Sequence, residues 1–382
     1  MILVFNVGSS SVKFSLYNRT SDSVNCLFQA NIDLNHKQAS LTDFNQSSEC
    51  GLIDCSPLSI VKFSIDQIGR YFPNANIEMV GHRVVYGGDC VGTMAITRDL
   101  LIHLDSFSLL APLHQPQSLT FIKAVQSLYP AMKQYACFDT SFHQTMPKEE
   151  TVIALPKSLQ SKEVQRYGFH GLSYQYIATE LARLNPNAIN ERIVIAHIGS
   201  GVSLCGLTQL QSRAATMGFS PLEGIPMASR SGNIDPALVL YLSDKYQISN
   251  KDLELKLNEE AGLKGLSGHQ GDIQSLLMDS SEQSDFAITF FVYQIVKQLG
   301  SIVAAIGGID CLVFTAGVGE HSAEIRKQIC QRLNWLGIEI DEKANLQNKQ
   351  IISSSSSQVS VKVIPTDETA MIAKNIYFKD EA

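Results

Sequence analysis

The sequence predicts a mixed α/β protein that contains two copies of one unit. An apolar run, a polar residue, a Gly/Ser turn and a second apolar run follow one another at 2–16 and again at 193–207. The two stretches begin half of the 382-residue chain apart, and Gly8 matches Gly199, as do the serines that follow them. Each stretch is typical of a strand, a tight turn and a strand. A coincidence of short apolar runs is the alternative, but the matched turns favour duplication, and the length fits two or three domains.

The rest of the chain alternates helical and strand-like patterns. Apolar periodicity predicts helices at 116–128, 174–184, 235–246, 285–306 and 323–333. Apolar and β-branched runs predict strands at 78–85, 151–154 and 359–364. The most apolar long stretch, 286–306, contains Lys297, which favours a buried helix over a membrane span. We expect the last helix to have Thr366 as its cap and Asp367 and Glu368 in its first turn.

Composition and charge narrow the class of protein. Hydrophobic residues make up 45% and charged residues 18%, which fits a globular protein with a large core. The net charge of -7 and the lack of a basic run argue against nucleic-acid binding. Eight scattered cysteines include no Cys-x-x-Cys pair, so a structural zinc site is not expected and the thiols indicate a reducing compartment. The N-terminus lacks the basic region and long apolar run of a signal peptide, which favours a cytoplasmic location.

Three glycine-rich turns suit phosphate binding. Two are the turns of the repeat, and the third follows the apolar run from Cys311 and contains Gly317 and Gly319. Such turns expose backbone N–H groups that can cradle phosphate oxygens. Lys13, just past the first turn, can place its ammonium on a phosphate, or it is an outward lysine on a strand edge. The Gly-x-x-x-x-Gly-Lys sequence of a P-loop is absent.

Five other charged residues stand in turns, at a strand end or at a helix start. Arg83 is interpreted either as a bidentate clamp on a carboxylate or phosphoryl group or as a structural ion-pair partner. Asp139 lies near a strand end, a common catalytic position in α/β proteins, and a helix cap is its alternative role. His170 and Arg230 would supply positive charge for phosphoryl transfer. Glu368 is a candidate magnesium ligand, although helix-dipole stabilisation alone would explain it.

Six groups of motifs, in order along the chain, resemble the acetokinase family. They are Asn-x-Gly-Ser-Ser-Ser-x-Lys at 6–13, Gly-His-Arg-Val-Val at 81–85, Ala-Pro-Leu-His at 111–114, Phe-Asp-Thr-x-Phe-His-Gln-Thr-Met-Pro at 138–147, Arg-Tyr-Gly-Phe-His-Gly at 166–171, and Pro-Leu-Glu-Gly with Arg-Ser-Gly at 221–232. The similarity extends over nearly the whole chain, to the final helix. It implies a two-lobed actin-like ATPase fold with duplicated ribonuclease H-like βββαβαβα domains. The implied N-terminal lobe is 1–148 with 366–382, and the C-terminal lobe, 149–365, would bind nucleotide and form a homodimer.

The resemblance also implies roles for residues at the matching positions. Magnesium, or manganese in its place, would be held by Asn6 and Glu368. The catalytic residues would be Asp139, His170 and Arg230, with Asp139 acting as an acid/base or orienting Arg83. Substrate contacts would come from Arg83, His114, Val85, Leu113, Phe169 and Pro221. ATP contacts would come from Ser9, Ser11, Lys13, His197, Ile198, Gly199, Ser200, Gly201, Asp272, Ile273, Gln274, Gly317, Val318, Gly319, Glu320 and His321.

The implied reaction is reversible in-line transfer of the γ-phosphoryl group of ATP to acetate, giving acetyl phosphate and ADP. A carboxylate is already deprotonated, so positioning and charge neutralisation are expected to carry the catalysis. Propionate or butyrate kinase is an alternative, because one methylene in an apolar pocket is worth only about 1–3 kcal/mol. Another alternative is a catalytically weakened ATP-binding sensor of the same fold. Ile273, Gln274 and His321 depart from the family pattern, which leaves the preference for ATP over GTP open, and Tyr86 stands where the family has histidine.

Overall fold

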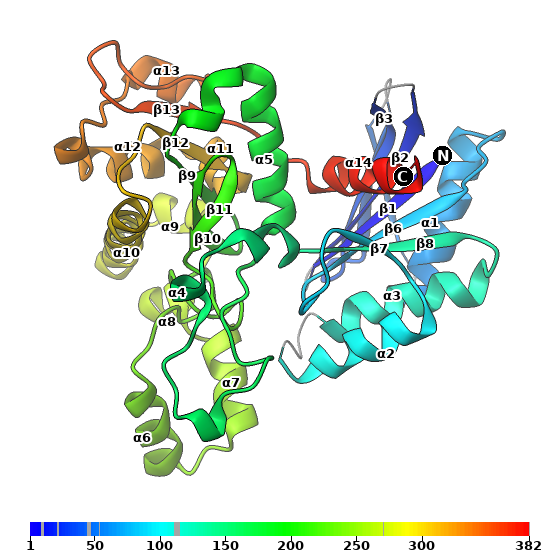
Figure 1. Ribbon diagram of the computed structural model, residues 1–382, viewed down its shortest axis with the longest axis horizontal. Coiled ribbons are helices and arrows are strands. Elements are labelled where there is room, and N and C mark those ends of the chain that lie inside the picture. Colours follow the sequence, from blue (N-terminus) through cyan, green and yellow to red (C-terminus); the bar gives the residue numbers. More distant parts are fainter. Residues whose placement is uncertain are drawn as a thin grey trace. The chain divides into compact units, whose positions relative to one another are not determined.

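The computed structural model describes residues 1–8, 11–20, 23–43, 47–52, 54–110, 115–269 and 271–381 (Figure 1). It is a mixed α/β protein with two separate sheets, as predicted. The chain divides into two compact units. Unit 1 contains Met1–Phe142, Gly171–Tyr176 and Asp367–Ala382, and unit 2 contains His143–His170 and Ile177–Thr366. These units differ from the expected lobes at 143–148, 171–176 and Thr366.

Unit 1 contains an eight-stranded sheet in the order β5-β4-β3-β2-β1-β6-β8-β7. Its strands are β1 (Ile2–Val7), β2 (Ser11–Arg19), β3 (Val24–Asp33), β4 (Gln38–Asp43), β5 (Ser47–Gly51), β6 (Met79–Val84), β7 (Thr93–Ala95) and β8 (Lys133–Phe138). Strands β1 to β5 pair as antiparallel neighbours, whereas β6 runs parallel to β1 and β8 parallel to β6. Its helices are α1 (Pro57–Tyr71), α2 (Arg98–Ser106), α3 (Gln115–Leu128), the start of α5 (Gly171–Leu184), and α14 (Glu368–Glu381).

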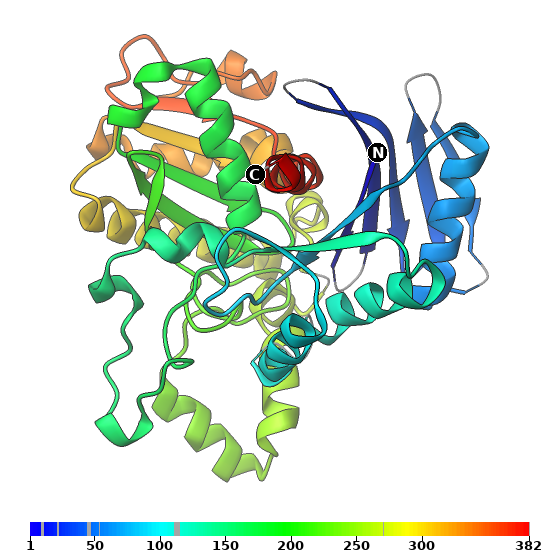
Figure 2. The ribbon, with the colours of Figure 1, turned by 45° about the vertical axis from the view of Figure 1, so that its right-hand side comes forward.

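Strand β1 is buried on both faces because helices cover both sides of this sheet. Successive residues of a strand point to opposite faces. Leu3 and Phe5 therefore pack in a core with residues of α1 and α3. Ile2 and Val4 face the other way and pack with Ile372 and other residues of α14. Figures 1 and 2 show α14 on one face of the sheet and α1 with α3 on the other.

Unit 2 contains a five-stranded sheet in the order β11-β10-β9-β12-β13. Its strands are β9 (Ile193–Ile198), β10 (Val202–Thr208), β11 (Gln211–Ala215), β12 (Cys311–Thr315) and β13 (Ser360–Val363). Its helices are α4 (Lys148–Thr151), the rest of α5 (Gly171–Leu184), α6 (Pro236–Tyr246), α7 (Asn250–Glu259), α8 (Gly262–Ser267), α9 (Ile273–Met278), α10 (Glu282–Ala305), α11 (Ala316–His321), α12 (Ala323–Gln331) and α13 (Glu342–Leu346).

Helix α10 is the main core helix of unit 2. By length and composition it could also cross a membrane. However, Phe291, Ile295 and Leu299 are completely buried, and α10 packs on β9, β10 and β11. Gly206 in β10 lets the helix approach closely, since a side chain there would collide with Ile302. The interpretation of this stretch as a buried helix is therefore confirmed.

The two sheets have the same core topology, which confirms the predicted duplication. The order β3-β2-β1-β6-β8 in unit 1 corresponds to β11-β10-β9-β12-β13 in unit 2, with the same strand directions. In both turns the matching glycine donates a backbone hydrogen bond across the turn, from the Gly8 amide to the Ser11 carbonyl at 2.8 Å and from the Gly199 amide to the Gly201 carbonyl at 3.0 Å. Asn6 and His197 occupy the matching position one residue before the end of the first strand.

Two local predictions were wrong. The stretch 151–154 is not a strand: α4 ends at Thr151, and Val152 makes only an isolated bridge to Gln165. The cap of α14 is Asp367 rather than Thr366, because an Asp367 carboxylate oxygen accepts the Ala370 amide at 2.8 Å. The Thr366 amide instead donates to Glu320 at 3.1 Å.

Candidate active site

Parallel strand ends in unit 1 bring together the residues that the sequence singled out. Strands β1, β6 and β8 are neighbours and run in the same direction, so their carboxyl ends lie at one edge of the sheet. Asn6 lies near the end of β1, Arg83 near the end of β6, and Asp139 directly after β8. Glu368, the first residue of α14, joins them because α14 packs on this sheet.

Arg83 is the centre of this cluster. Its Nε donates to Oδ1 of Asp139 at 2.9 Å and its Nη2 to Oδ2 at 2.6 Å, which is a bidentate ion pair. Its Nη1 donates to Oδ1 of Asn6 at 3.1 Å and lies 3.8 Å from Oε2 of Glu368. A guanidinium has five N–H groups. Three are used by the described residues, so within that part of the chain one N–H on Nη1 and one on Nη2 remain for an anionic ligand.

Burial makes the charges of this cluster strongly interdependent. Asp139 is 1% exposed, and its burial raises the pKa of its carboxyl group, although the charge of Arg83 opposes the rise. Burial alone would lower the pKa of Arg83, but Asp139 and Glu368 together raise it above the usual value. Arg83 therefore stays cationic, and Asp139 is committed to holding it rather than capping a helix.

Asn6 and Glu368 form a pair of oxygen donors suited to a hard cation. The Asn6 amide nitrogen donates to Oε2 of Glu368 at 2.6 Å, so the two side chains are in direct contact. A carboxylate and an amide oxygen are ligands that Mg²⁺ accepts, with water completing its octahedral shell. The residues present therefore fit a magnesium ion. Lys13 pairs with Asn6 across β1 and β2, and its side chain is exposed.

In unit 2, His170 and His197 stack on one another at the glycine turn. Their ring centroids are 4.1 Å apart, with 21° between the planes. Nδ1 of His170 is 2.8 Å from the Ser203 hydroxyl, which fixes the ring. His170 has a left-handed backbone (φ 57°) as the residue before α5. A side chain at Gly201 would lie 2.9 Å from Nε2 of His170, so the glycine allows the imidazole to approach the turn.

Arg230 is held in the loop that carries Pro221. Its Nη1 donates to the Pro221 carbonyl at 3.3 Å and lies 3.7 Å from the sulfur of Met227. A Cβ at Gly201 would be 4.0 Å from this Nη1, so Arg230, like His170, lies at the second glycine turn. The arrangement brings two basic side chains to the second glycine turn, which suits a phosphate.

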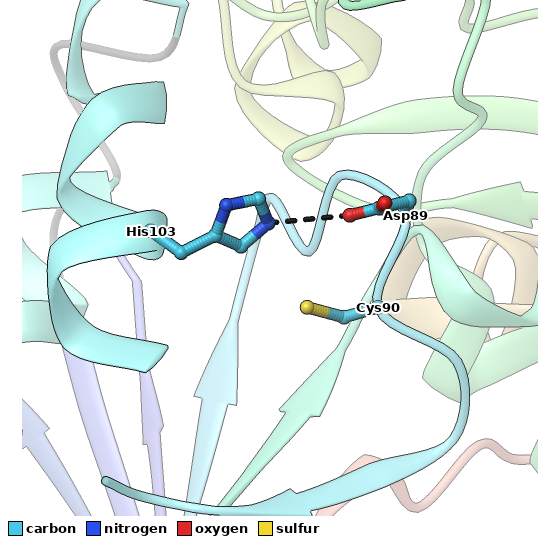
Figure 3. A group of neighbouring side chains, drawn as sticks. All are labelled: Asp89, Cys90 and His103. Atoms are coloured by element: carbon cyan, nitrogen blue, oxygen red, sulfur yellow. Dashed lines mark ion pairs between the residues drawn. The ribbon is translucent and has the colours of Figure 1, made fainter. Parts of the chain in front are cut away.

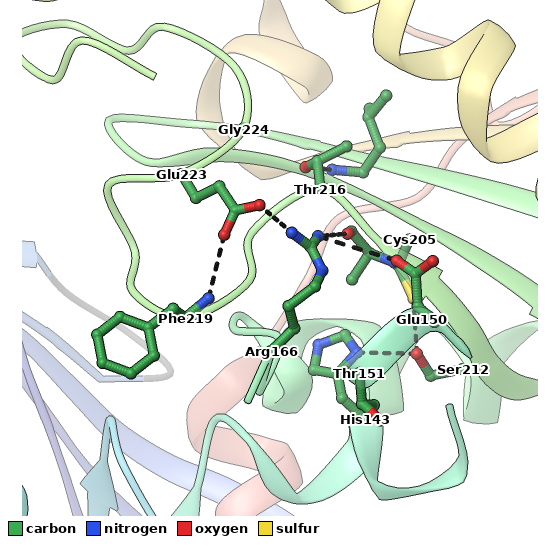
Figure 4. Close-up of polar contacts among 12 residues, drawn as sticks. His143, Glu150, Thr151, Arg166, Cys205, Ser212, Thr216, Phe219, Glu223 and Gly224 are labelled. Atoms are coloured by element: carbon green, nitrogen blue, oxygen red, sulfur yellow. Dashed lines mark hydrogen bonds and ion pairs between the residues drawn. The ribbon is translucent and has the colours of Figure 1, made fainter. Parts of the chain in front are cut away.

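A half-buried arginine, Arg166, joins the segments that carry His170 and Pro221 (Figure 4). Arg166 forms an ion pair with Glu223, donates to the Ala215 carbonyl at 2.9 Å, and lies 3.9 Å from Glu150. Burial lowers the pKa of Arg166, and Glu150 partly opposes this. Because Arg166 precedes His170 by four residues and Glu223 follows Pro221 by two, the pair joins the two motifs in space.

The third glycine-rich segment is itself a short helix, α11, rather than only a turn. It starts at Ala316, which has a left-handed backbone (φ 64°) of the kind that costs a non-glycine residue about 1–3 kcal/mol. The Thr315 hydroxyl before it is fully buried and has no hydrogen-bond partner in the part of the chain that the structure describes. An unpaired buried hydroxyl beside Gly317 and Gly319 fits a polar ligand such as a nucleotide phosphate.

A family model of the acetokinase family matches residues 1–374. The chain belongs to the acetokinase family. An acetate kinase of Rhodopseudomonas palustris is 40% identical to it, over 99% of this chain and 98% of the relative. An acetate kinase of Rickettsia felis is 38% identical, over 98% of each.

Two solved structures of kinases are also similar to this chain over nearly its whole length. A propionate kinase from Francisella tularensis has a TM-score of 0.90 and 32% identity, over 98% of each chain. An acetate kinase from Porphyromonas gingivalis has a TM-score of 0.85 and 31% identity, over 99% of this chain and 98% of the other. The predicted actin-like fold of the acetokinases is thus confirmed.

The residues expected around the nucleoside of an acetokinase lie at the start of α9 and at the end of α11. Asp272 caps α9, because its Oδ2 accepts the Ser275 amide and hydroxyl, both at 2.8 Å. Ile273 is buried and Gln274 is exposed. The His321 side chain is 77% exposed and lies 3.9 Å from Glu320.

The acyl-pocket residues expected from the acetokinase motifs are divided between the units. Val85 is buried in unit 1, Phe169 is buried in unit 2, and Pro221 is half-buried there. Ser9, Leu113 and His114 lie outside the described residues. Ser11 is the first residue of β2.

Sequence reasoning missed two buried residues that support the site. Arg326 is fully buried and donates to the carbonyls of Gly319 and Glu320, both at 2.9 Å, so it holds the end of α11. His143 is buried with one ring nitrogen 2.8 Å from the Ser212 hydroxyl and the other 2.8 Å from the Phe169 carbonyl. His143 lay inside a recognised motif, but no signal indicated its role, and Arg326 lay in an ordinary helical pattern.

Proposed function

We propose that this chain catalyses reversible, Mg²⁺-dependent phosphoryl transfer between ATP and acetate. The observation that carries the proposal is the Arg83 guanidinium, which Asp139 and Asn6 hold in place while two of its N–H groups have no partner among the described residues and suit an anion. Such a fork matches the two oxygens of a carboxylate. Membership of the acetokinase family supports ATP as the second substrate.

In the proposed mechanism Arg83 binds and orients the acetate carboxylate. An acetate oxygen attacks the γ-phosphorus of ATP, the bond from that phosphorus to the β–γ bridging oxygen breaks, and ADP leaves. Acetate enters as the anion, so no proton has to be removed from the nucleophile. His170 and Arg230 offer N–H donors to the equatorial oxygens, where charge is spread in the transition state. The backbone at 199–201 and the segment 316–321 supply donors for the remaining phosphates.

Asn6 and Glu368 are proposed to hold the magnesium ion. Bound there, the ion would neutralise phosphate charge and orient the nucleotide. Within the chain, Asn6 has a second role, because its amide oxygen accepts from Arg83 and its nitrogen donates to Glu368. Asn6 therefore couples the position of the Arg83 guanidinium to the position of the Glu368 carboxylate.

Acetate is proposed over propionate or butyrate because the named relatives at the highest identity quoted above are acetate kinases. The structural similarity to a propionate kinase keeps that acid as the second candidate. Val85 and Phe169, both buried apolar side chains, are the proposed contacts of the acyl group.

We also propose a cytoplasmic homodimer that binds neither nucleic acid nor membrane. Helix α6 supports the dimer, because none of its residues is buried and four of its large apolar side chains are exposed: Leu238, Leu240, Tyr241 and Tyr246. A net charge of -7 supports the lack of nucleic-acid binding. Sedimentation of the wild type against Leu240→Glu would test the dimer.

The deciding experiment measures ATP consumption with Mg²⁺ and acetate, propionate or butyrate, with the acyl phosphate trapped as the hydroxamate. We expect the highest kcat/KM with acetate. Arg83→Ala should lose about 10²–10³-fold in kcat/KM, the range for removal of one preorganised donor group. A higher kcat/KM for propionate would transfer the proposal to that acid. Absence of acyl phosphate from all three acids, in a folded protein that binds ATP, would favour the sensor instead.

A further inference from the structure

A cluster of three metal-ligand side chains lies in unit 1 outside the site described above (Figure 3). Asp89 and Cys90 are on the segment between β6 and β7, and His103 is on α2. Their donor atoms all lie within 4.8 Å of one another. Figure 3 shows the imidazole facing Asp89, with the Cys90 sulfur turned toward the imidazole. We propose that Asp89, Cys90 and His103 form a binding site for Zn²⁺ or a similar transition metal, separate from the proposed magnesium site.

The chemistry of the three donors points to zinc rather than magnesium. A thiolate, an imidazole and a carboxylate are all ligands of Zn²⁺, whereas Mg²⁺ prefers oxygen and retains water. Sequence reasoning did not anticipate the site because no Cys-x-x-Cys pair exists. The ligands here are one thiol, one imidazole and one carboxylate from two separate segments.

The observed spacing is close to that of a tetrahedral ion. Nε2 of His103 is 3.3 Å from Oδ1 of Asp89. Nitrogen and oxygen ligands about 2.0–2.1 Å from one tetrahedral zinc ion would be about 3.3–3.4 Å apart. The separation of this pair is therefore compatible with an ion bound by both side chains. On binding, the thiol proton leaves for solvent and the sulfur coordinates as the thiolate.

Asp99 on α2 lines the same pocket as the three ligands. Asp99 and His103 are four residues apart on the helix, so they lie on the same face. Both line a pocket of about 750 Å³, together with Asp89 and Cys90. The pocket is large enough for an ion with water, and three protein ligands plus water is the arrangement of an open zinc site.

An ion bound at this location would restrain a segment that leads into the active site. The segment 85–92 is already tied to the residues after Asp139, since the Gly87 amide donates to the Thr140 hydroxyl at 3.1 Å and the Gly92 amide to the Ser141 hydroxyl at 2.7 Å. A bound ion would also link the segment 85–92 to α2. The segment begins just after Arg83 and carries Val85, so occupancy is expected to restrict the acyl-binding residues of unit 1.

Metal binding can be measured without any activity. Metal-free protein, in millimolar Mg²⁺, is titrated with Co²⁺ and observed by absorption, and Zn²⁺ affinity is then measured by competition with a chromophoric chelator. We expect one ion per chain, a thiolate-to-cobalt charge-transfer band, and the intense visible bands of tetrahedral Co²⁺. Cys90→Ser should remove the charge-transfer band. His103→Ala should weaken Zn²⁺ binding about 100-fold or more, because even loss of an outer-shell partner costs about 10–100-fold.

Matched controls separate this cluster from other sites. His36 is an exposed histidine that pairs with Asp33 at 2.9 Å, and Cys55 is a half-buried thiol elsewhere in unit 1, so His36→Ala and Cys55→Ser should bind like the wild type. Glu368→Gln removes the proposed magnesium carboxylate and should also leave Zn²⁺ affinity unchanged. His103 is partly exposed, so its variant remains informative if the buried Cys90 variant fails to fold. Unchanged affinity in His103→Ala, or a loss that follows Glu368→Gln instead, would overturn the proposal.

Discussion

The Asp139→Asn substitution removes one charge from the Arg83 pair while it preserves the shape of the side chain. Asp139 accepts two hydrogen bonds from Arg83, at 2.9 and 2.6 Å. Asparagine retains one acceptor oxygen and turns an NH₂ group toward the other donor, so one charge-assisted bond of about 1.5–3 kcal/mol is lost. Removal of one partner of a buried ion pair costs about 3–5 kcal/mol in all. Because Glu368 remains 3.8 Å from Arg83, we expect a loss near the lower limit, about 3 kcal/mol of unfolding free energy.

The kinetic consequence depends on what Asp139 does. If it only holds the guanidinium, a displacement of about 1 Å should reduce kcat/KM about 10²-fold. The pH dependence of the remaining activity should then keep the shape of the wild-type profile. If Asp139 transferred a proton, the variant would also lose the limb of the profile that its carboxyl group produces.

The assay is the hydroxamate reaction from pH 5 to 9, with urea unfolding of each protein in parallel. Asp54→Asn is a matched control, since Asp54 is an exposed residue of unit 1 that bonds only to Ser56 and Ser59 among the described residues. It should leave kcat/KM unchanged. A kcat/KM for Asp139→Asn within threefold of the wild type would refute the positioning role. A reduced rate with a missing limb would replace positioning by proton transfer.

Three further substitutions test other parts of the structure. Arg326→Met leaves the backbone carbonyls of Gly319, Glu320 and Asn345, and the side-chain amide oxygens of Asn345 and Asn348, without their donor. It should cost about 3 kcal/mol of unfolding free energy, measured in urea, and a loss under 1 kcal/mol would contradict this argument. Gly201→Ala should displace His170 and lower kcat/KM about 10²-fold with little change in Tm; wild-type kinetics would separate His170 from the reaction. Burial lowers the pKa of His143 to about 4, below its ordinary 6.5. Above pH 6.5 His143 is unprotonated in both the folded and the unfolded protein. As the pH falls toward 4, His143 binds a proton only in the unfolded protein. His143 should therefore account for about 3 kcal/mol of the stability lost across that window, and the buried His82, whose pKa is also lowered to about 4, should add a similar loss. In His143→Gln this part of the pH slope should vanish, and an unchanged slope would assign it to another group.

Sequence reasoning identified the residues at the strand ends of unit 1 but not their partnership. Arg83 and Asp139 are 56 residues apart, and only the parallel pairing of β6 with β8 shows that they meet. The duplicated hairpins were predictable because their alternation and turns are local. The strand at 151–154 was not, since apolar residues there form a single bridge without a ladder. At the last helix, Thr366 and Asp367 are both good caps, and only the tertiary bond from Thr366 to Glu320 decides between them.

The placement of α14 determines when during synthesis the protein can become an enzyme. The strands of unit 1 are synthesised before α14, so the face of β1 that bears Ile2 and Val4 lacks the cover of that helix until residues 368–381 emerge. Glu368 arrives with that helix. The nascent chain therefore carries a partly open apolar surface while the residues of unit 2 are synthesised, which is a natural binding site for chaperones. Any product that stops before residue 367 lacks both the cover of the sheet and the carboxylate, so truncated chains should be cleared rather than contribute partial activity.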